Sequence, residues 1–411
     1  MKQKLFRDVA GTVLLALTAS ICLHAQEFKI GSESVQVHGF GTQGYIKTND
    51  NNWLTMNTSG GGSGAFTDVG LNLSSQITSK FRVAAQGYDR KLGQLGDWHP
   101  QFDFYMADFR FKPWLGFRGG KVKTVLGLFT DTQDMDFDHT FALLPQSIYP
   151  TDLRDTTIAH VGGDIYGRVK LPAKYGNVAY TAYGGQRSDS KYSGYPYLLA
   201  HVAPGVSIHL NSYGGPIYGG DLRWMTPVRG LKVGVSRLNE FITGKGTFFG
   251  APYSEWSNKD WTNQFYGAYA RNRFHAESEY KRYFQQKDVF NGGTWFFADT
   301  RGWYVSGAYK LNNWLESGAY YSHYRINFNG GPLVPGGMSI DTDFTDPQKR
   351  DFDKVMTAKF SLPKNFTVKV EGHFMAGNGQ AMYPDGFYTS VNPNGLKDNT
   401  NALVVRTGYS F

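Results

Sequence analysis

The feature that most constrains this chain is a period of two residues that returns along almost all of its length. In one stretch, Phe274 and Tyr280 fall on one face of an extended chain, and Glu277 and Lys281 fall on the other. Alternation over about ten residues with one apolar face is typical of a β-strand that crosses a membrane at a tilt. The clearest stretches are residues 273–283, 365–374 and 402–411.

Applied to the whole chain, this alternation predicts 16 strands, joined by connections that are alternately long and short. They cover residues 35–46, 67–78, 80–90, 102–112, 117–128, 161–171, 177–185, 217–225, 231–239, 262–271, 273–283, 302–311, 314–325, 353–362, 365–374 and 402–411. An even number of antiparallel strands can close on itself, so that no edge strand leaves unpaired amides in lipid. We therefore expect an all-β fold, a closed antiparallel transmembrane β-barrel with short periplasmic turns and long extracellular loops.

Composition excludes several other classes of protein. A mean hydropathy of −0.41 does not fit a bundle of membrane helices, each of which needs about 20 apolar residues. An aromatic content of 16% is too high for a disordered chain. A soluble sandwich or propeller would also alternate, but aromatic residues near strand ends favour the girdles of a membrane barrel. The girdle candidates are Tyr45, Trp114, Tyr166, Trp224, Trp261, Trp303, Trp314 and Tyr409.

Residues 1–25 have the form of a cleaved secretory signal peptide. Basic residues precede an apolar stretch from Val9 to Leu23, and Ala25 supplies the small residue before the cleavage site. Cleavage there leaves residues 26–411 as a single barrel domain. Cys22, the chain's one cysteine, lies in the removed segment, so we expect no disulfide in the exported protein. A lipoprotein or a membrane anchor fits this segment less well.

Several motifs resemble those of Gram-negative outer-membrane porins. They are Val37-His38-Gly39-Phe40, Gln43-Gly44-Tyr45 and the terminal Phe411 with apolar residues at alternate positions before it. Three further motifs are similar to the phosphate-selective-type (anion) group of porins: Gly120-Lys121-Val122-Lys123, Leu126-Gly127-Leu128 and Leu143-Leu144-Pro145-Gln146-Ser147-Ile148-Tyr149. The resemblance implies a passive diffusion channel of the bacterial outer membrane, for small hydrophilic solutes or anions.

The same resemblance implies partners and an assembly signal. Phe411 and Tyr409 would belong to the terminal signal that the barrel-assembly machinery reads. We expect contact with outer-membrane lipid and lipopolysaccharide, a homotrimer, no nucleic-acid partner, no cofactor and no metal.

The lumen of a 16-stranded barrel is an aqueous channel, so its selectivity depends on the side chains that face inward. By alternation the expected lumen cations are Arg82, Arg110, Lys112, Lys121, Lys123, Arg168, Lys170, Arg223, Lys281, Lys369 and Arg406. The expected acids on that face are fewer: Asp108, Asp164, Asp221, Glu277, Glu279 and Glu371. Because a narrow low-dielectric wall focuses the potential, this surplus favours anions. Mutual pairing of these charges, which would leave a nearly neutral pore, is the alternative.

The longest predicted connection, residues 129–160, is rich in acids. It contains Asp131, Asp134, Asp136, Asp138, Asp152, Arg154 and Asp155. By resemblance to porins it would fold back into the barrel as a constriction loop, and its acids would face the basic wall across the pore in a transverse field. A charged loop outside the barrel is the alternative. The alternating aspartates also suggest calcium, but the glycine and distal glutamate of a calcium loop are absent from the sequence.

Two other classes of function stay open. A barrel enzyme or adhesin would need reactive groups, and His275-x-Glu277 and Glu371-x-His373 each share one strand face. These pairs fit a hydrated lumen wall better, and we assign no catalytic residue. A specific sugar or aromatic-solute channel would need aromatic side chains in the lumen, whereas alternation assigns most Tyr and Phe residues to the lipid face.

Overall fold

The computed structural model describes residues 26–30, 33–201, 208–289, 293–330, 346–382, 392 and 394–411. The expected signal peptide, residues 1–25 with Cys22, lies outside the described residues. Strands dominate the described chain, with one short helix, α2 (Gly194–Ala200), and four 3₁₀ turns. No helix among the described residues is long and apolar enough to cross a membrane.

The strands form one continuous sheet. They are β1 (Gln26–Ile30), β2 (Glu33–Thr48), β3 (Ser63–Thr78), β4 (Phe81–Leu92), β5 (Gln101–Lys112), β6 (Leu115–Lys123), β7 (Ala159–Lys170), β8 (Asn177–Asp189), β9 (Ile208–Met225), β10 (Leu231–Glu240), β11 (Thr243–Phe248), β12 (Ala251–Arg271), β13 (Phe274–Val289), β14 (Gly293–Lys310), β15 (Leu315–Gly330), β16 (Arg350–Leu362), β17 (Phe366–Gly377) and β18 (Asn399–Ser410).

These 18 strands occupy 16 positions in the barrel. β10 and β11 are two parts of one barrel strand, because both pair with β9 on one side and β12 on the other. β1 forms a hairpin with the start of β2. The last strand, β18, pairs with β2 from Ala402↔Thr48 to Ser410↔Phe40 and closes the sheet. The expected closed antiparallel barrel is confirmed.

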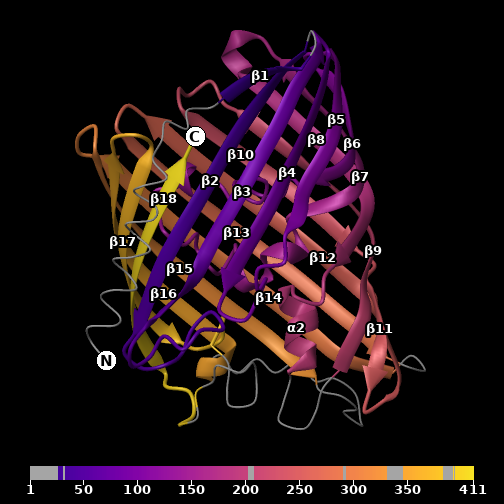
Figure 1. Ribbon diagram of the computed structural model, residues 1–411, viewed down its shortest axis with the longest axis vertical. Helices are drawn as coiled ribbons and strands as arrows, with labels where there is room; N and C mark the ends of the chain where they lie inside the picture. Colours follow the sequence, from indigo (N-terminus) through magenta and orange to yellow (C-terminus); the bar gives the residue numbers. More distant parts are fainter. Residues whose placement is uncertain are drawn as a thin grey trace.

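The strands run obliquely around the barrel, and its two ends differ (Figure 1). Tight turns join strands at the upper end in this view, whereas α2 and β11 lie at the lower end. The turn between β3 and β4 needs only a few residues, because a tight hairpin turn can connect two neighbouring antiparallel strands. The short and long ends are therefore the expected periplasmic and extracellular ends.

The two faces of the wall separate apolar from polar side chains. On β13, Phe274 and Tyr280 are exposed on the outer surface, while Glu279 is buried inside the barrel. On β17, Val370 and Phe374 lie outside, and Lys369, Glu371 and His373 are inside and fully buried. The period of two therefore assigns the faces of these strands correctly, as the pleat of a sheet requires.

One girdle candidate is wrong. Tyr166 lies on the inner face of β7, where its hydroxyl donates to the Asp108 carboxylate at 2.5 Å. The cation of Arg110 lies 5.8 Å from the centre of its ring. A tyrosine can serve either face of the wall, since it combines an apolar ring with a polar tip, so its residue type alone does not fix its side.

The predicted strand over residues 117–128 is too long. β6 ends at Lys123, and the chain then leaves the wall. The chain end, by contrast, stays in the wall: Phe411 exchanges backbone hydrogen bonds with Gly39, and the ring of Phe411 covers that glycine. Whether Tyr409 and Phe411 act as an assembly signal stays a prediction.

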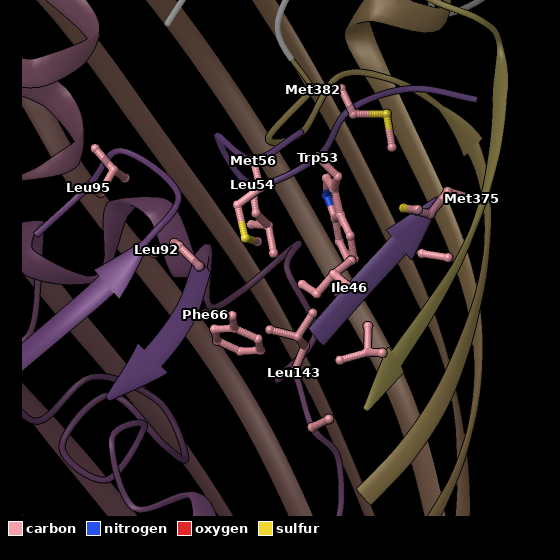
Figure 2. Packing of buried hydrophobic residues seen from close by; sticks show 13 residues of the cluster. Ile46, Trp53, Leu54, Met56, Phe66, Leu92, Leu95, Leu143, Met375 and Met382 are labelled. Atoms are coloured by element: carbon pink, nitrogen blue, oxygen red, sulfur yellow. The ribbon is translucent and has the colours of Figure 1, made fainter. Parts of the chain in front are cut away.

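A compact apolar core lies inside the barrel, near the end that is expected to be extracellular. The connection between β2 and β3 folds inward and brings Trp53, Leu54 and Met56 against Ile46 of β2 and Phe66 of β3. Figure 2 shows these side chains gathered around Leu143, which comes from the connection between β6 and β7. Burial of side chains of this size stabilises a fold by about 1.5–3 kcal/mol each.

The separation of faces predicts opposite environments for spin labels on the outer and inner face. A chain that starts at residue 26 has no cysteine, so single substitutions can be labelled cleanly. Labels at Val305→Cys and Leu403→Cys, which are outer positions, should collide more often with oxygen than with a water-soluble nickel complex. A label at Arg168→Cys, on the inner face, should show the reverse. Equal accessibility at all three positions would contradict the assigned faces.

Candidate functional site

The connection between β6 and β7, residues 124–158, runs through the barrel lumen and is called the inserted loop below. Its two ends are held together at the wall, where Lys123 pairs with Ala159. The next residues continue this contact, because the Thr124 amide donates to the Ile158 carbonyl at 3.0 Å. From this base the loop crosses to inward-facing side chains of distant strands.

Two wall lysines hold the loop backbone. The ammonium of Lys369 on β17 donates to the Asp136 carbonyl at 2.6 Å and forms an ion pair with the Asp136 carboxylate at 2.9 Å. The ammonium of Lys359 on β16 donates to the carbonyls of Phe137 at 2.7 Å and His139 at 2.9 Å. These contacts satisfy carbonyls that a loop in the lumen would otherwise leave unpaired.

A buried carboxylate on the same wall binds the next turn of the loop. Glu371 accepts hydrogen bonds from the amides of Ala142 at 2.9 Å and Leu143 at 3.2 Å. Behind it, His373 bridges Glu371 and Asp353, at 2.9 and 2.6 Å. The His373 ring thus connects two carboxylates, and the predicted Glu371-x-His373 pair contributes to loop attachment.

A second carboxylate anchors the start of the loop on β13. Glu279 accepts from the Leu128 amide at 3.0 Å and from the Tyr149 hydroxyl at 2.6 Å. Gln264 and Tyr304 donate to the same carboxylate at 2.6 and 2.9 Å. A buried carboxylate with so many donors is well satisfied, which is the condition for placing a charge inside a protein.

Ion pairs attach the loop to the opposite side of the barrel. Lys123 contacts Asp134 of the loop at 2.6 Å and Asp103 of β5 at 3.2 Å. Arg154 of the loop reaches the same Asp103 at 2.8 Å. Asp155 pairs with Arg90 of β4 at 2.9 Å. Loop acids and wall cations therefore meet directly.

This contact corrects the expectation of a transverse field. Asp136 pairs with Arg406 as well as Lys369, so its charge is compensated within about 3 Å. Burial alone would raise the pKa of Asp136, but the Arg406 and Lys369 charges hold it below its ordinary value. The acids of the Asp134-x-Asp136-x-Asp138 run also diverge: Asp134 points to Lys123, and Asp136 to β17 and β18.

The remaining acids of the loop occupy different environments. Asp138 is exposed, and Asp152 is buried. Burial raises the pKa of Asp131 despite the nearby Arg223 charge.

Apolar contacts add to these polar ones. Phe141 packs on Tyr320 and Val355, and Ile148 packs beside Tyr304. Leu143 enters the core of Figure 2. Since hydrophobic burial and ion pairs act at several points of its length, the loop is fixed in one position.

The alternation places most expected lumen residues on the inner face. By register the inner cations are Arg82, Arg110, Arg168, Lys170, Arg223, Lys281, Lys369 and Arg406. The acids on that face are Asp108, Asp164, Asp221, Glu277, Glu279 and Glu371.

The prediction that Lys121 faces the lumen is wrong, because the alternation on this strand was shifted by one residue. Lys121 pairs with Tyr105 and Val161, both exposed on the outer surface, and its ammonium donates to the Phe102 carbonyl. Val122, which is fully buried, takes the inner position instead. A shift of one residue exchanges the faces of a strand. Lys123, at the end of β6, still reaches Asp134 of the loop and Asp103 of β5.

The prediction that Lys112 faces the lumen is wrong for a different reason. The register shifts between Arg110 and Lys112, so that Lys112 lies opposite Leu115 at the rim of the barrel. Its ammonium lies over the rings of Phe111 and Trp114, which are exposed on the outside. A bulge of this kind reverses the side of every later residue and leaves no clear mark in the sequence.

Other inner-face charges were missed. Arg118, which takes the inner position on β6, pairs with Asp164 at 2.9 Å. Arg187 pairs with Asp189 and Glu240, both at 2.6 Å. The predicted strand 177–185 ended too early, and extending its alternation to residue 189 would have placed Arg187 on the inner face. Assigning Arg118 to the inner face of β6 would have identified its pair with Asp164.

A gap remains between the inserted loop and the wall made by β8 to β13. The cavity has a volume of about 110 Å³. It is lined by Thr130, Gln133, Ile148, Tyr149, Pro150, Leu153, Arg154, Thr156, Thr157, Arg187, Tyr195, Tyr213, Glu240, Thr262, Lys281, Tyr283 and Gln285. Within it, Lys281 donates to the Ile148 carbonyl at 3.0 Å and forms no ion pair with a described carboxylate.

The gap contains exceptions to the expectation that most Tyr and Phe residues face lipid. Tyr149, Tyr195, Tyr213 and Tyr283 all line it. Other tyrosines are buried elsewhere in the barrel interior, among them Tyr88, Tyr183, Tyr266, Tyr304 and Tyr320. The hydroxyls of Tyr88, Tyr266 and Tyr304 donate to carboxylates of Asp68, Asp221 and Glu279 on the inner face, so these phenol rings are compatible with a polar wall.

Comparisons with known proteins agree with the barrel. No protein-family model and no curated protein matches the chain. Among solved structures, OmpT of Vibrio cholerae has a TM-score of 0.53 at 12% identity and covers 94% of this chain and 100% of its own. An anion-selective porin from Comamonas acidovorans also scores 0.53 at 12% identity, covering 92% and 100%. The outer-membrane channel DcaP of Acinetobacter baumannii scores 0.52 at 13%, covering 95% and 100%. At these identities the likeness shows the fold.

Replacing Gly127 should displace the start of the loop. Gly127 has a φ of +69°, and a Cβ there would collide with Gln264 and Glu279. Gly127→Ala should therefore lower stability by about 1–3 kcal/mol and raise single-channel conductance. Gly119→Ala, where a Cβ has room, is the matched control. Unchanged conductance and thermal stability in Gly127→Ala would contradict the close contact.

Acid should loosen the loop through His139. Burial and the Lys369 charge lower the pKa of His139 to about 4, and its Nε2 contacts the Thr132 carbonyl at 2.9 Å. Between pH 6.5 and 4 the unfolded chain binds a proton that the folded one does not, so stability falls as pH falls. We expect wild type to lose roughly 2–3 kcal/mol more than His139→Gln between pH 7 and 4.5. Parallel thermal-unfolding curves across pH would contradict this.

Proposed function

We propose that this chain is an outer-membrane porin, a non-enzymatic channel through which small hydrophilic solutes diffuse passively, with a preference for anions. The observation that carries the proposal is a closed 16-position barrel whose interior is narrowed by the inserted loop. A barrel with an apolar outer face suits a bilayer, where all backbone amides must pair within the protein.

The charges on the inner wall support a preference for anions. Arg82, Arg110, Arg168 and Lys170 are exposed on the inner face near the short turns. Deeper in the lumen, Lys281 adds an ammonium that is not paired with any carboxylate of the described residues. Other deep cations, such as Arg154, Lys369 and Arg406, are compensated by loop and wall acids. The cations without such a partner would therefore contribute most to the potential that a permeating ion meets.

The tyrosines of the gap favour a second candidate, a channel specific for sugars or other ring-shaped solutes. Tyr149, Tyr195, Tyr213 and Tyr283 line the narrow part of the path together with Arg187. Phenol rings can stack on flat solutes while their hydroxyls offer hydrogen bonds. Saturation of the current by one solute class would distinguish this candidate from general diffusion.

Location and partners follow from the same proposal. We infer export to the bacterial outer membrane after cleavage of residues 1–25, with folding by the barrel-assembly machinery. We also propose a homotrimer, and OmpT of Vibrio cholerae, at 12% identity, has been solved in a trimer form. Outer-membrane lipid and lipopolysaccharide would surround the apolar face.

The direct test is recording from the purified protein in a planar bilayer. The proposal predicts discrete conductance steps and a reversal potential across a salt gradient whose sign reports anion preference. A preference for cations would contradict the proposed anion selectivity. A protein that folds but never conducts would contradict the proposal that it is a channel.

Lys281→Gln tests the residue basis of that selectivity. Removing the uncompensated ammonium should lower the ratio of anion to cation permeability roughly twofold. Lys80→Gln is the matched control, because the Lys80 ammonium lies over the ring of Phe111 on the outer face. A reversal potential that shifts equally in both variants would show that Lys281 does not face the conducting path.

A further inference from the structure

The outer face of β10 to β16 carries a cross-strand row of arginines. Register pairs connect its members from strand to strand, Arg237↔Asn263↔Arg282↔Arg301↔Arg325↔Arg350. Residues directly opposite on neighbouring strands lie about 5 Å apart. The chain thus places guanidinium groups side by side on the outside of the wall, where they cannot contribute to the lumen. We call these six residues the arginine row.

Aromatic side chains flank the arginine row on both sides. On the side of the short turns, the next outer row contains Phe265, Tyr280, Trp303, His323 and Phe352. Trp303 stacks on His323 at 5.3 Å, and His323 stacks on Phe352 at 4.3 Å. On the side of the long loops, Trp261 stacks on Phe284 at 5.7 Å. Aromatic rows of this kind mark the level where a barrel meets lipid headgroups.

The positive charge of Arg237, Arg282 and Arg301 is only partly compensated by described carboxylates. Arg282 and Arg301 share one carboxylate, Asp299, at 2.9 Å. Arg237 donates to the amide oxygens of Asn239 and Asn263 and forms no ion pair with a described carboxylate.

The side chains of Arg282 and Arg301 are accessible from outside the barrel. The side chain of Arg301 is 52% exposed and that of Arg282 is 38% exposed. The guanidinium groups of Arg237 and Arg282 both lie over the ring of Trp261, at 4.7 and 5.3 Å from its centre. Lys259 lies near them, with its ammonium over Phe284 at 5.3 Å.

We propose that the arginine row binds the phosphate groups of a glycolipid in the outer leaflet of the membrane. Like charges on adjacent strands repel one another, and a bound dianion would relieve that repulsion. The planar fork of a guanidinium matches phosphate oxygens, with two hydrogen bonds to one group. This inference rests on the proposed membrane location.

The surroundings of the row select an amphiphilic ligand. The same strands expose Phe265 and Val305 toward the short turns, at 54% and 50%. Acyl chains can cover this apolar surface while phosphates meet the arginines. Soluble phosphate would gain only the polar half of that contact, so the structure favours a phosphorylated lipid.

Native mass spectrometry of the purified protein in detergent can count bound lipid. The probe is diphosphorylated lipid A, compared with the same lipid after removal of both phosphates. We expect wild type to bind the phosphorylated form at least tenfold more tightly, and salt to weaken this preference. Both Arg237→Gln and Arg282→Gln/Arg301→Gln should reduce it, the double variant to near the level of the dephosphorylated lipid.

Two controls keep the test specific. Arg271→Gln/Arg273→Gln removes the same charge at the periplasmic end of β12 and in the turn that follows, and it should bind like wild type. Arg237→Gln leaves no carboxylate without its partner, whereas the double variant uncovers Asp299. Equal binding of both lipids by wild type, or equal loss in the control variant, would overturn the proposal.

Other outcomes separate this inference from the proposed function. If the row variants change the oligomeric state in lipid-free detergent, the face is an interface between copies of the chain, and the lipid proposal is wrong. A protein that conducts but shows no phosphate-dependent binding overturns the lipid site alone. A protein that binds the phosphorylated lipid but never conducts overturns the channel alone.

Discussion

The structure depends on one constraint, that a sheet in lipid must leave no backbone amide unpaired. The pairing of β18 with β2 meets this constraint and closes the barrel. Closure gives every strand an outer face for lipid and an inner face for water, which is why a period of two dominates the sequence. It also creates a lumen wider than wall side chains can fill, and the inserted loop occupies part of it.

Buried charge determines where that loop lies. Lys369, Glu371 and Glu279 are almost completely removed from solvent, and each is satisfied by loop groups. Removing one partner of such a buried contact typically costs 3–5 kcal/mol, so alternative loop positions are strongly disfavoured. Many acids and bases of the loop and the wall pair with each other and hold the loop in place. The selectivity we propose therefore depends on cations without such a partner, such as Lys281.

Strand number and most inner faces follow from the sequence because they depend on a local period. Lys112 and Lys121 were misplaced because a bulge and a covered apolar position, Val122, break that period. The contacts of the loop could not be read in the same way. Lys369 and Asp136 are far apart in the chain, and only the closed barrel brings them together. Tyr166 was assigned to the outer girdle because its ring, without its hydroxyl partner Asp108, suggests an apolar site.

A disulfide across the lumen tests the central claim, that the inserted loop lies inside the barrel. Ser147 of the loop and Ser322 of β15 have their hydroxyls 2.7 Å apart. The variant Ser147→Cys/Ser322→Cys, in a chain that starts at residue 26, should form this bond nearly completely under mild oxidation, as protease mapping would show. Cysteines that stay reduced and react freely with a large external maleimide would contradict the account.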